Sequence, residues 1–332
     1  MIEPVRAAAP VRLDLAGGWT DVPPYSAREG GLVVSAAVQL YAHAEVRPGG
    51  ASYRLVAEDL GQEIEVSDAA MIPSRGSLPL LAAGLRMLPV GPCTLITRSD
   101  APPGSGLGSS GALDVALVTA LSHVRGELPD RRRIAELACH LEAAEAGIPG
   151  GRQDQFAAAF GGFLRLEFRD PTVAVEQVAV PADVAAELER RMLLFYTGAS
   201  RFSGATIDRV MQAYERGEPA IAGALDGLRT AAERMPEALR SGDLPRIGEL
   251  LSRNWLHQQA LDPAMCTPLM SRLERAMVEA GALGGKAAGS GAGGSMFFLL
   301  GDEDLRPAAE AARALGMTRL PLRWAEEGVH PC

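Results

Sequence analysis

The chain has 332 residues, of which 47% are apolar, and it carries a formal net charge of −9. This length exceeds what one hydrophobic core usually takes and suits two well-packed domains. The acidic balance excludes general binding to nucleic acids or to anionic membranes, because both need a basic protein face.

The N-terminal segment is a predicted strand over 5–15 that leads into an irregular loop. Arg12 and Asp14 alternate there with apolar residues, as in a strand with one buried face. The loop at 16–25 contains paired glycines and paired prolines, which exclude both a strand and a helix. Such a loop after a buried strand suits ligand contacts. Asp21 is the candidate ligand-binding residue, and the alternative is a tight turn that Asp21 caps.

The next part of the chain is rich in predicted strands. Residues 31–47 form a second extended segment, and 51–66 form a hairpin. A short helix at 78–88 and a strand at 93–98 follow. We therefore expect the first third of the chain to form a sheet that packs against helices.

The stretch at 102–111 has glycine at alternate positions and runs directly into a predicted helix at 112–124. At such a helix start, the free backbone N–H groups and the helix dipole favour an anion such as phosphate. Ser109 and Ser110 offer hydroxyl groups to oxygen or Mg²⁺. The loop lacks the lysine of the GxxxxGK[ST] phosphate-binding loop. The alternative is an ordinary flexible loop with a serine N-cap.

A predicted helix at 131–146 carries two acidic residues, Glu142 and Glu145, near its C-terminal end. Acidic groups there oppose the helix dipole, which indicates either a cation site or a solvated acidic end. A Gly/Pro-rich break follows, and Asp154 then opens a run of small residues. Asp154 is either an N-cap or a general base in a site shared with phosphate and a hydroxyl group.

The second half of the chain reads as a separate α+β unit. Strands at 162–168 and 173–180 close the first domain, and the composition shift at 181–186 is the expected boundary. The predicted elements after it are a strand at 191–197, helices at 205–214, 220–235, 244–261 and 268–280, a glycine-rich strand pair within 286–300, a helix at 305–315 and a strand at 319–324.

Two polar stretches of this half suggest contacts with a ligand. Ser200 and Arg201, in the turn after the strand at 191–197, can hold an anionic group, or Arg201 is a surface residue. The glycine cluster at 289–294 lies between two predicted core strands, which suggests a close backbone approach. The alternative for this cluster is a loose hairpin turn.

The positions of the cysteines and the lengths of the apolar runs argue against a zinc site, a signal peptide and a membrane span. Cys93, Cys139, Cys266 and Cys332 lie far apart without CxxC or Cys/His spacing, which argues against a structural zinc site. The sequence shows no signal-peptide core and no run long enough to span a membrane. We expect a cytoplasmic protein without membrane or nucleic-acid partners, and the sequence leaves a homodimer open. Lys286 is the only lysine, an imbalance that we attribute to coding bias.

Three glycine-bearing motifs, in this order, resemble those of the galactokinase–homoserine kinase–mevalonate kinase–phosphomevalonate kinase (GHMP) superfamily. They are APVRLDLAGGWTD, PPGSGLGSSGA and KAAGSGAGGSMFFL. The resemblance implies a two-domain α+β fold, the GHMP kinase fold. Its N-terminal domain, expected at 1–185, is similar to ribosomal protein S5 domain 2. Its C-terminal domain, expected at 186–332, is ferredoxin-like, and the site lies between the two.

Two sugar kinase branches share features with the chain. LDLAGGWTDVPPY resembles the L-fucokinase motif, whereas GGRQDQFAAAFGGF and LLFYTGASRFS resemble D-glycero-D-manno-heptose 7-phosphate kinases. The resemblance implies a kinase that uses ATP and Mg²⁺ to phosphorylate the anomeric hydroxyl group of a sugar or sugar phosphate. Heptose 7-phosphate is the first expectation, and L-fucose or a related free sugar is the alternative. A ligand-sensing protein that keeps the fold without catalysis is a further alternative.

The resemblance also implies roles for individual residues. Asp154 would orient or deprotonate the sugar hydroxyl group, and Arg12 would face the transferring phosphate or the substrate. Ser110 and Glu142 would hold Mg²⁺. The ATP phosphates would be wrapped by Pro103, Gly104, Ser105, Gly106, Leu107, Gly108, Ser109 and Ser110. The substrate side would comprise Gly18, Trp19, Thr20, Asp21, Tyr25, Gln153, Ser200, Arg201, Gly291, Ala292, Gly293 and Gly294, the last four opposite the phosphate loop.

One position departs from the superfamily pattern. Many members carry Lys or Arg two residues before the motif proline, where this chain has Ala8 before Pro10. Arg12 is then the nearest candidate for a positive charge. This departure argues against a mechanism with a lysine beside Asp154. Phosphoryl transfer needs positioning and charge neutralisation more than covalent help, so one arginine with Mg²⁺ and helix-end amides suffices.

Overall fold

The first sheet is built around two long strands, β1 (Val5–Ala16) and β2 (Gly31–Pro48), which pair antiparallel along their length. Its order is β12-β1-β2-β5-β3-β4, and the β6–β7 hairpin pairs with the N-terminal half of β2. The other strands are β3 (Tyr53–Ala57), β4 (Gln62–Val66), β5 (Cys93–Ser99), β6 (Phe163–Arg169), β7 (Thr172–Gln177) and β12 (His330–Pro331). This computed structural model describes residues 3–73, 76–148, 150–198 and 204–331.

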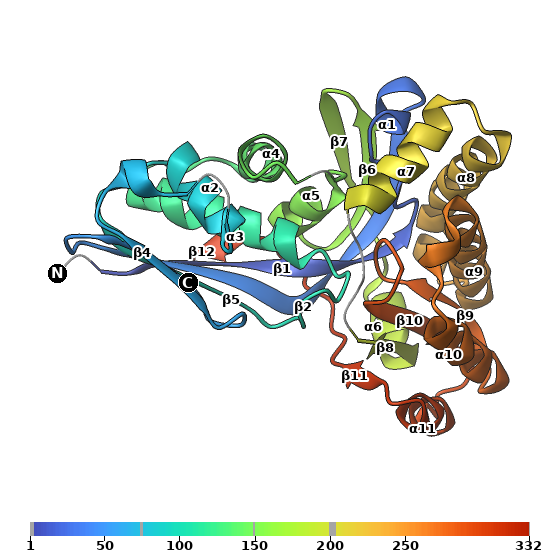
Figure 1. Cartoon of the computed structure of the whole chain (residues 1–332). Helices are drawn as coiled ribbons and strands as arrows, with labels where there is room; N and C mark the ends of the chain where they lie inside the picture. Colours follow the sequence, from blue (N-terminus) through green and yellow to red (C-terminus); the bar gives the residue numbers. More distant parts are fainter. Residues whose placement is uncertain (1–2, 74–75, 149, 199–203, 332) are drawn as a thin grey trace.

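Four helices lie over one face of this sheet (Figure 1). They are α2 (Pro79–Met87), α3 (Ser109–Val124), α4 (Arg131–His140) and α5 (Gln153–Phe160). Helix α3 is buried on nearly every side, because it packs against both the sheet and its neighbouring helices. Short segments complete the layer: α1 (Tyr25–Arg28), a 3₁₀ turn (Ala69–Met71) and a π-helical turn (Leu141–Glu145).

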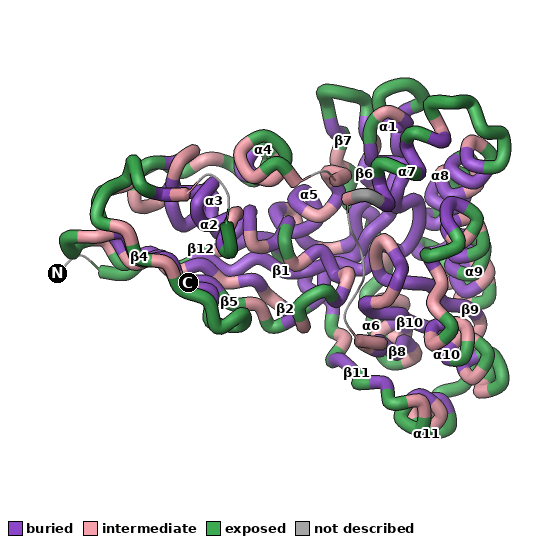
Figure 2. Tube along the Cα trace, viewed as in Figure 1, coloured by how far each residue is buried: buried purple, intermediate pink, exposed green. Residues whose placement is uncertain are grey.

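The burial of β2 changes along its length. Residues 31–38 are buried without alternation, whereas from Gln39 onward buried and more exposed residues alternate. Strand β1 is buried on both faces from Ala7 to its end, and Figure 2 shows this continuous buried region. Helices α8 and α9 of the second unit contact β1, and α8 also contacts β2. The ends of the two strands near the interface are therefore covered from both sides.

The second unit is a four-stranded antiparallel sheet of order β11-β8-β10-β9 with helices packed on it. Its strands are β8 (Met192–Tyr196), β9 (Ala282–Ala287), β10 (Ser295–Leu300) and β11 (Thr318–Leu320). Its helices are α7 (Gly204–Glu215), α8 (Pro219–Ser241), α9 (Leu244–Leu261), α10 (Pro268–Glu279) and α11 (Arg306–Ala314), with a 3₁₀ turn at Pro263–Met265. Helices separate the first two strands and the last two, as in the ferredoxin-like βαββαβ arrangement, which confirms that expectation.

Most predicted elements are confirmed within a few residues, and the clearest differences are the following. The predicted helix at 220–235 extends to Ser241 as α8. Residues 181–186 open a helix, α6 (Ala182–Arg191), which begins directly after Pro181. The predicted helix at 131–146 ends at His140 and continues as the π-helical turn. The predicted strand at 319–324 stops at Leu320.

The chain end returns to the first sheet. Trp324 forms a bridge with Val38, and β12 pairs with β1. The backbone N–H of Ala325 donates to the carbonyl oxygen of Ala37 at 2.9 Å. The segment that the sequence assigned to the end of the second domain therefore completes the edge of the first sheet.

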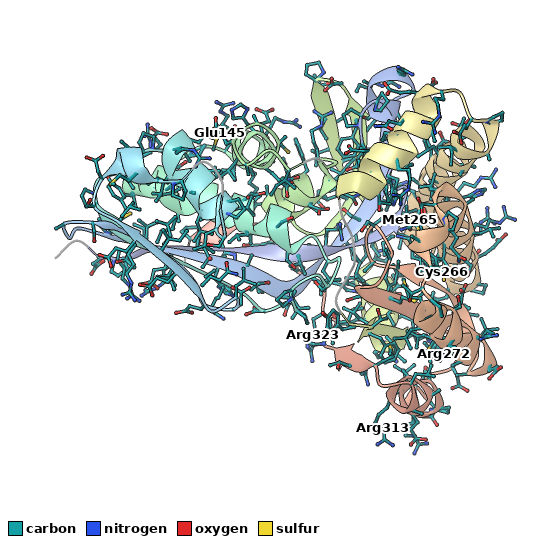
Figure 3. All side chains as sticks on the ribbon, viewed as in Figure 1. Glu145, Met265, Cys266, Arg272, Arg313 and Arg323 are labelled. Atoms are coloured by element: carbon teal, nitrogen blue, oxygen red, sulfur yellow. The ribbon has the colours of Figure 1, made fainter. Side chains whose placement is uncertain are left out.

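Exposed arginine side chains occur on both units. Figure 3 labels three exposed examples, Arg272 on α10, Arg313 on α11 and Arg323 after β11. Within the described part of the chain, only Arg12 and Lys286 are buried basic residues, with 5% and 0% of their surface exposed. Both lie where the two units meet. In the same part of the chain, no helix combines the length and apolarity needed to cross a membrane.

Candidate active site

A cavity of about 390 Å³ lies between the two units and is lined by all three glycine-bearing motifs. Its wall combines the end of β1, the loops before α3 and α5, helix α7 and the loop after β9. The lining residues are Arg12, Asp14, Gly18, Trp19, Asp21, Val22, Gly104, Ser105, Gly106, Gly108, Ser109, Ser110, Glu142, Ile148, Gly150, Gly151, Gln153, Asp154, Ile207, Gly289 and Ser290.

The loop before α3 is suited to an anion. Gly104, Gly106 and Gly108 have φ angles of +69°, +73° and +76°, a conformation that glycine adopts without strain. Helix α3 begins at Ser109 after the N-cap residue Gly108, and no side chain of the described residues caps it, so its first N–H groups lie at the cavity wall. Among the described residues, the buried hydroxyl group of Ser105 has no hydrogen-bond partner.

Six of the eight residues expected to wrap the ATP phosphates line this cavity, and two do not. Pro103 lies outside the wall, and its carbonyl oxygen accepts a hydrogen bond from the Tyr196 hydroxyl group at 3.0 Å. Leu107 is fully buried in the hydrophobic core. Its carbonyl oxygen accepts the backbone N–H of Arg12 at 2.9 Å, which attaches the loop to β1.

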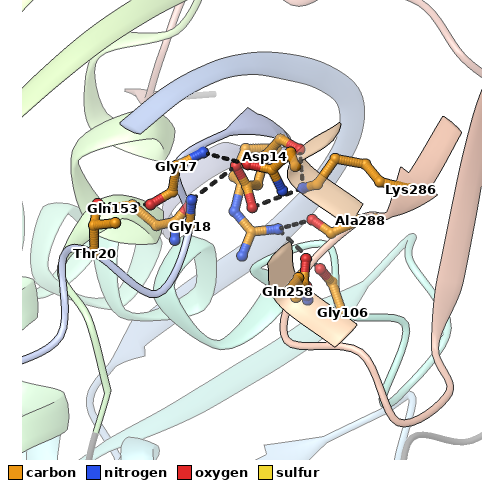
Figure 4. A network of polar contacts seen from close by, with 12 residues as sticks. Asp14, Gly17, Gly18, Thr20, Gly106, Gln153, Gln258, Lys286 and Ala288 are labelled. Carbon is orange, nitrogen blue, oxygen red and sulfur yellow. Dashed lines mark hydrogen bonds and ion pairs between the residues drawn. The ribbon is translucent and has the colours of Figure 1, made fainter. Parts of the chain in front are cut away.

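Arg12 joins three parts of the site. Its Nε donates to Asp154 Oδ1 at 2.8 Å, and its Nη2 lies 2.7 Å from the same oxygen. Its Nη1 donates to the carbonyl oxygens of Gly106 at 2.8 Å and Ala288 at 3.0 Å. Figure 4 shows these two carbonyl groups on opposite loops. The guanidinium group therefore holds the carboxylate, the first glycine loop and the end of β9 together.

Asp154 lies in the first turn of α5, with a quarter of its side chain exposed to the cavity. Arg152 occupies the N-cap position, and the Asp154 carboxylate turns to Arg12, so the reading of Asp154 as an N-cap is wrong. The carboxylate packs close to the start of α3. A Cβ atom at Gly111 would be 2.5 Å from Asp154 Cβ, so glycine is needed for this approach.

Glu142 and Ser110 line the same part of the cavity, and Glu145 does not. Gln155 Nε2 donates to Glu142 Oε2 at 2.5 Å. Burial, with a smaller contribution from the negative charge of Asp154, raises the pKa of Glu142 to about 7. A hydroxyl and a carboxylate oxygen are ligands that suit Mg²⁺, which usually takes few protein ligands beside substrate phosphates. The described residues contain no cluster of three or more His, Cys, Asp or Glu suited to a metal.

The loop after β1 divides into residues that face the cavity and residues that hold the loop. Gly18, Trp19 and Asp21 line the cavity. Thr20 does not, because its fully buried hydroxyl group donates to Gly17 O at 2.6 Å. Tyr25 is also fully buried away from the cavity, and its hydroxyl group donates to Asp226 Oδ1 at 2.9 Å.

Asp21 is held by the turn before α5. Its two carboxylate oxygens accept hydrogen bonds from the backbone N–H and the side-chain amide of Gln153, at 3.1 and 3.2 Å. Burial raises the pKa of Asp21 to about 6. Trp19 has a φ of +79° and a buried indole N–H without a partner among the described residues. A strained backbone and an unpaired donor in a cavity wall both suit ligand contact.

The second glycine loop meets the cavity with other residues than expected. Gly289 and Ser290 line it, whereas Gly291, Ala292, Gly293 and Gly294 are not among the described lining residues. Ala292 donates its N–H to Met265 O at 2.8 Å. A Cβ atom at Gly294 would be 2.8 Å from Ser105 O, so this glycine supports the first loop from behind. Ser200 and Arg201 lie outside the described residues.

Sequence reasoning missed a buried ion pair at the edge of the cavity. Lys286 Nζ lies 2.8 Å from Asp14 Oδ2, and their side chains are 0% and 3% exposed (Figure 4). The alternation of β1 placed Asp14 on a polar strand face, but the second unit covers that face. The sequence signal that could have indicated the pair is that Lys286 is the only lysine and stands three residues before the glycine cluster at 289–294.

Comparisons with known proteins agree with these features. The family model for the GHMP kinases N terminal domain matches residues 78–162, and that for GHMP kinases C terminal matches 235–317. The chain is 30% identical over 305 residues to the D-glycero-alpha-D-manno-heptose 7-phosphate kinase of Campylobacter jejuni, covering 89% of both chains.

Two further similarities extend over nearly the whole chain. The bifunctional fucokinase/GDP-fucose pyrophosphorylase of Arabidopsis thaliana is 27% identical over 89% of this chain, which spans 30% of that longer protein. The solved structure of a D-glycero-D-manno-heptose 1-phosphate kinase from Bacteriodes thetaiotaomicron superimposes with a TM-score of 0.75 and 27% identity. That superposition covers 99% of this chain and 98% of the other. The α+β fold of two domains expected from the motifs is thereby confirmed.

Proposed function

The chain belongs to the GHMP kinase family and is a phosphotransferase with a hydroxyl acceptor, and we propose that it phosphorylates the anomeric hydroxyl group of D-glycero-D-manno-heptose 7-phosphate. ATP, the phosphate donor of this family, would supply the phosphoryl group, and the product would be the 1,7-bisphosphate. The similarity to the Campylobacter jejuni kinase over 89% of both chains supports this substrate.

The observation that carries the reaction class is the ion pair of Arg12 and Asp154 in the wall of one cavity with an open helix start. The Asp154 carboxylate reaches the cavity and can accept a proton. The N–H groups at the start of α3 lie beside it and would bind phosphate oxygens. Phosphoryl transfer needs this combination of a positioned acceptor hydroxyl group and neutralised phosphate oxygens.

The chain's residues then divide the work of the transfer. Asp154 takes the proton of the anomeric hydroxyl group while that oxygen bonds to the γ-phosphorus atom and the bond to ADP breaks. A guanidinium group has five N–H donors. The contacts of Arg12 with Asp154, Gly106 and Ala288 use four of them, so one is left for an oxygen of the transferring group.

The residues present also fit a magnesium ion. Ser110 and Glu142 would hold it, because both offer oxygen atoms in the cavity wall and Glu142 is fixed there by Gln155. When bound, Mg²⁺ neutralises phosphate charge. Asp14 and Asp154 each have a basic partner, whereas Glu142 has none among the described residues, which favours a cation near Glu142.

One observation favours a second candidate substrate, an uncharged sugar such as L-fucose. Among the described residues that line the cavity, Arg12 is the only cation, and it is paired with Asp154. A phosphate group at the far end of the substrate would need another partner. Arg201, which lies outside the described residues, is the candidate for that partner, and the fucokinase similarity supports the uncharged alternative.

A test of the proposed function is an ADP-release assay with Mg-ATP across a sugar panel. The panel holds heptose 7-phosphate, sedoheptulose 7-phosphate, mannose, fucose, galactose and mevalonate, and Asp154→Asn is the control variant. Turnover on heptose 7-phosphate that the variant abolishes would support the proposal. Turnover on fucose alone would replace the substrate. ATP binding without turnover on any sugar would favour a ligand-sensing protein.

The variant Arg201→Ala separates the two substrates. If the substrate carries a distal phosphate that Arg201 binds, the variant raises the KM for the sugar phosphate and leaves the KM for a free sugar unchanged. An unchanged KM for heptose 7-phosphate would contradict this role of Arg201.

A further inference from the structure

The only lysine of the chain occupies a buried position at the interface of the two units. All other basic residues are arginine, so the composition favours arginine wherever either residue serves. Lys286 is nevertheless a lysine, on β9, with none of its surface exposed. An arginine has a wide planar head, whereas an ammonium group is a compact point charge with three donors. The residue type therefore indicates a site that is shaped for an ammonium group.

The surroundings of Lys286 show what that ammonium group does. Its Nζ donates to the backbone carbonyl of Asp14 at 2.6 Å and to Asp14 Oδ2 at 2.8 Å. The other carboxylate oxygen of Asp14 accepts the backbone N–H of Gly18 at 3.3 Å. A Cβ atom at Gly18 would lie 2.1 Å from Asp14 Oδ2, so this glycine makes room for the carboxylate. Both ends of the ion pair are thus enclosed.

The ion pair lies beside the contacts that hold Arg12. Asp14 follows Arg12 by two residues on β1, so the two share a strand face, and Ala288 follows Lys286 by two residues, directly after β9 ends. The carbonyl oxygen of Ala288 accepts Arg12 Nη1 at 3.0 Å and the backbone N–H of Asp14 at 3.4 Å. Figure 4 shows Asp14, Lys286 and Ala288 in this arrangement. Strand β1 is thereby joined to β9 by the ion pair of Asp14 and Lys286, and to the residue after β9 by the hydrogen bonds to Ala288.

We propose that Lys286 is a positioning residue for phosphoryl transfer: by binding Asp14 it fixes β9 against β1 and so sets Arg12 and the second glycine loop relative to the phosphate-binding loop. This proposal rests on the proposed kinase function. A displacement of about 1 Å at a reacting group can lower a rate about a hundredfold. A loss of this contact would therefore change kcat, even though neither side chain carries out the chemistry.

The energetics of buried ion pairs supply a way to separate positioning from folding. Removing one partner leaves an uncompensated buried charge and is strongly destabilising, whereas replacing both by neutral side chains is often tolerated. Lys286→Met should lower Tm and kcat together. The double variant Asp14→Asn/Lys286→Met should recover most of the Tm, because no buried charge is left. Its kcat should stay about ten- to a hundredfold below that of the wild type, because the ammonium group that fixes β9 is absent.

The experiment compares Tm, kcat and the KM values for ATP and sugar in the wild type, these two variants and Lys286→Arg. We expect Lys286→Arg to lower kcat as well, because the wider guanidinium group does not fit the enclosed site even though the positive charge is kept. Arg6→Met is the control: Arg6 lies on β1, as Asp14 does, and forms an exposed ion pair with Glu45 on β2, so this variant should change neither Tm nor kcat.

The outcomes discriminate between explanations. A double variant that recovers both Tm and kcat would show a purely structural role and overturn the proposal. A loss confined to the KM for sugar would make Asp14 a sugar ligand and overturn it too. Wild-type protein that turns over no sugar would instead overturn the proposed function on which this inference rests.

Discussion

Gly289 lies with its backbone directly against the carbonyl group of Gly106: a Cβ atom at position 289 would be 2.3 Å from that oxygen. The φ of Gly289 is not in the left-handed region, so glycine is required there by space alone. We predict that Gly289→Ala pushes the two glycine loops apart. Overpacking of this kind costs about 1–3 kcal/mol of stability. The KM for ATP should rise and kcat should fall about tenfold or more, as ADP-release kinetics would measure.

Gly223 provides the matched control for this substitution. It lies on the exposed side of α8, and a Cβ atom there would meet nothing within 4 Å. Gly223→Ala should leave the kinetics unchanged and stabilise the helix by up to about 1 kcal/mol. Wild-type kinetics in Gly289→Ala would mean that the close approach of the loops has no part in nucleotide binding.

Asp21 should make the stability of the protein depend on pH. Burial raises its pKa from 3.8 to about 6, so between these values the folded state binds more protons than the unfolded state. The contribution of Asp21 to the free energy of unfolding is therefore fully present below pH 3.8 and is lost as the pH rises through 6. Asp21→Asn removes this loss. The variant should be more stable than the wild type at pH 8 by up to about 3 kcal/mol, with a difference that vanishes towards pH 4.

Urea denaturation of both proteins at pH 4.5, 6 and 8 would measure this difference. Gln153 Oε1 is buried without a partner among the described residues, so a turned amide can accept the new side-chain N–H. Asp208→Asn, at an exposed position on α7, is the control and should show no such trend. A variant that loses stability equally at all three pH values would contradict the assigned pKa shift. The KM of Asp21→Asn for sugar should rise, because the carboxylate that would accept hydrogen bonds from the sugar is lost.

The parts of the fold and site that the sequence predicted are those coded by neighbouring residues. Alternate glycines before an apolar helical run are a local pattern, and Gly104, Gly106 and Gly108 do adopt the left-handed backbone that only glycine favours. The apolar pattern that predicts α9 and the extended composition that predicts β2 are equally local. Asp154 was placed with Ser110 and Glu142 because a resemblance to known motifs supplied the three-dimensional arrangement.

The parts that could not be predicted depend on contacts between distant segments. Whether the charged face of β1 meets solvent or another domain is not coded in β1, so Asp14 looked like a surface residue. The predicted strand at 319–324 corresponds to β11 in the second sheet, whereas β12, which joins β1, is only two residues long and was not predicted. Thr20 and Tyr25 have side chains suited to a sugar, but each finds an intramolecular partner instead.

A comparison of variants at Glu142 and Glu145 tests whether Mg²⁺ needs Glu142 itself or only an acidic residue near the end of this helix. Both lie in the π-helical turn, but only Glu142 lines the cavity, whereas Glu145 lies near His140. We predict that Glu142→Gln raises the Mg²⁺ concentration for half-maximal rate about tenfold or more, since a neutral amide is a weaker ligand than a carboxylate. Glu145→Gln should leave it unchanged. Rates measured against Mg²⁺ at fixed ATP would decide, and equal behaviour of the two variants would remove Glu142 from the metal site.

Arg12→Lys should be among the most damaging single substitutions in the site, although it conserves the charge. The guanidinium group binds Asp154 with two nitrogens and two carbonyl groups with the third, and all these partners lie on different segments. A lysine has one nitrogen and cannot reproduce this fork. We expect kcat to fall about a hundredfold or more, with smaller changes in KM.

Arg6→Lys is the matched control for this prediction, because Arg6 lies on the same strand in an exposed ion pair with Glu45. Exposed pairs contribute about 0–1 kcal/mol, so this variant should match the wild type in both Tm and kcat. If Arg12→Lys kept its kcat while the KM for ATP rose, Arg12 would serve nucleotide binding and not the transfer step. A fall in kcat with an unchanged far-UV spectrum and Tm would instead place its effect on the transferring group and on Asp154.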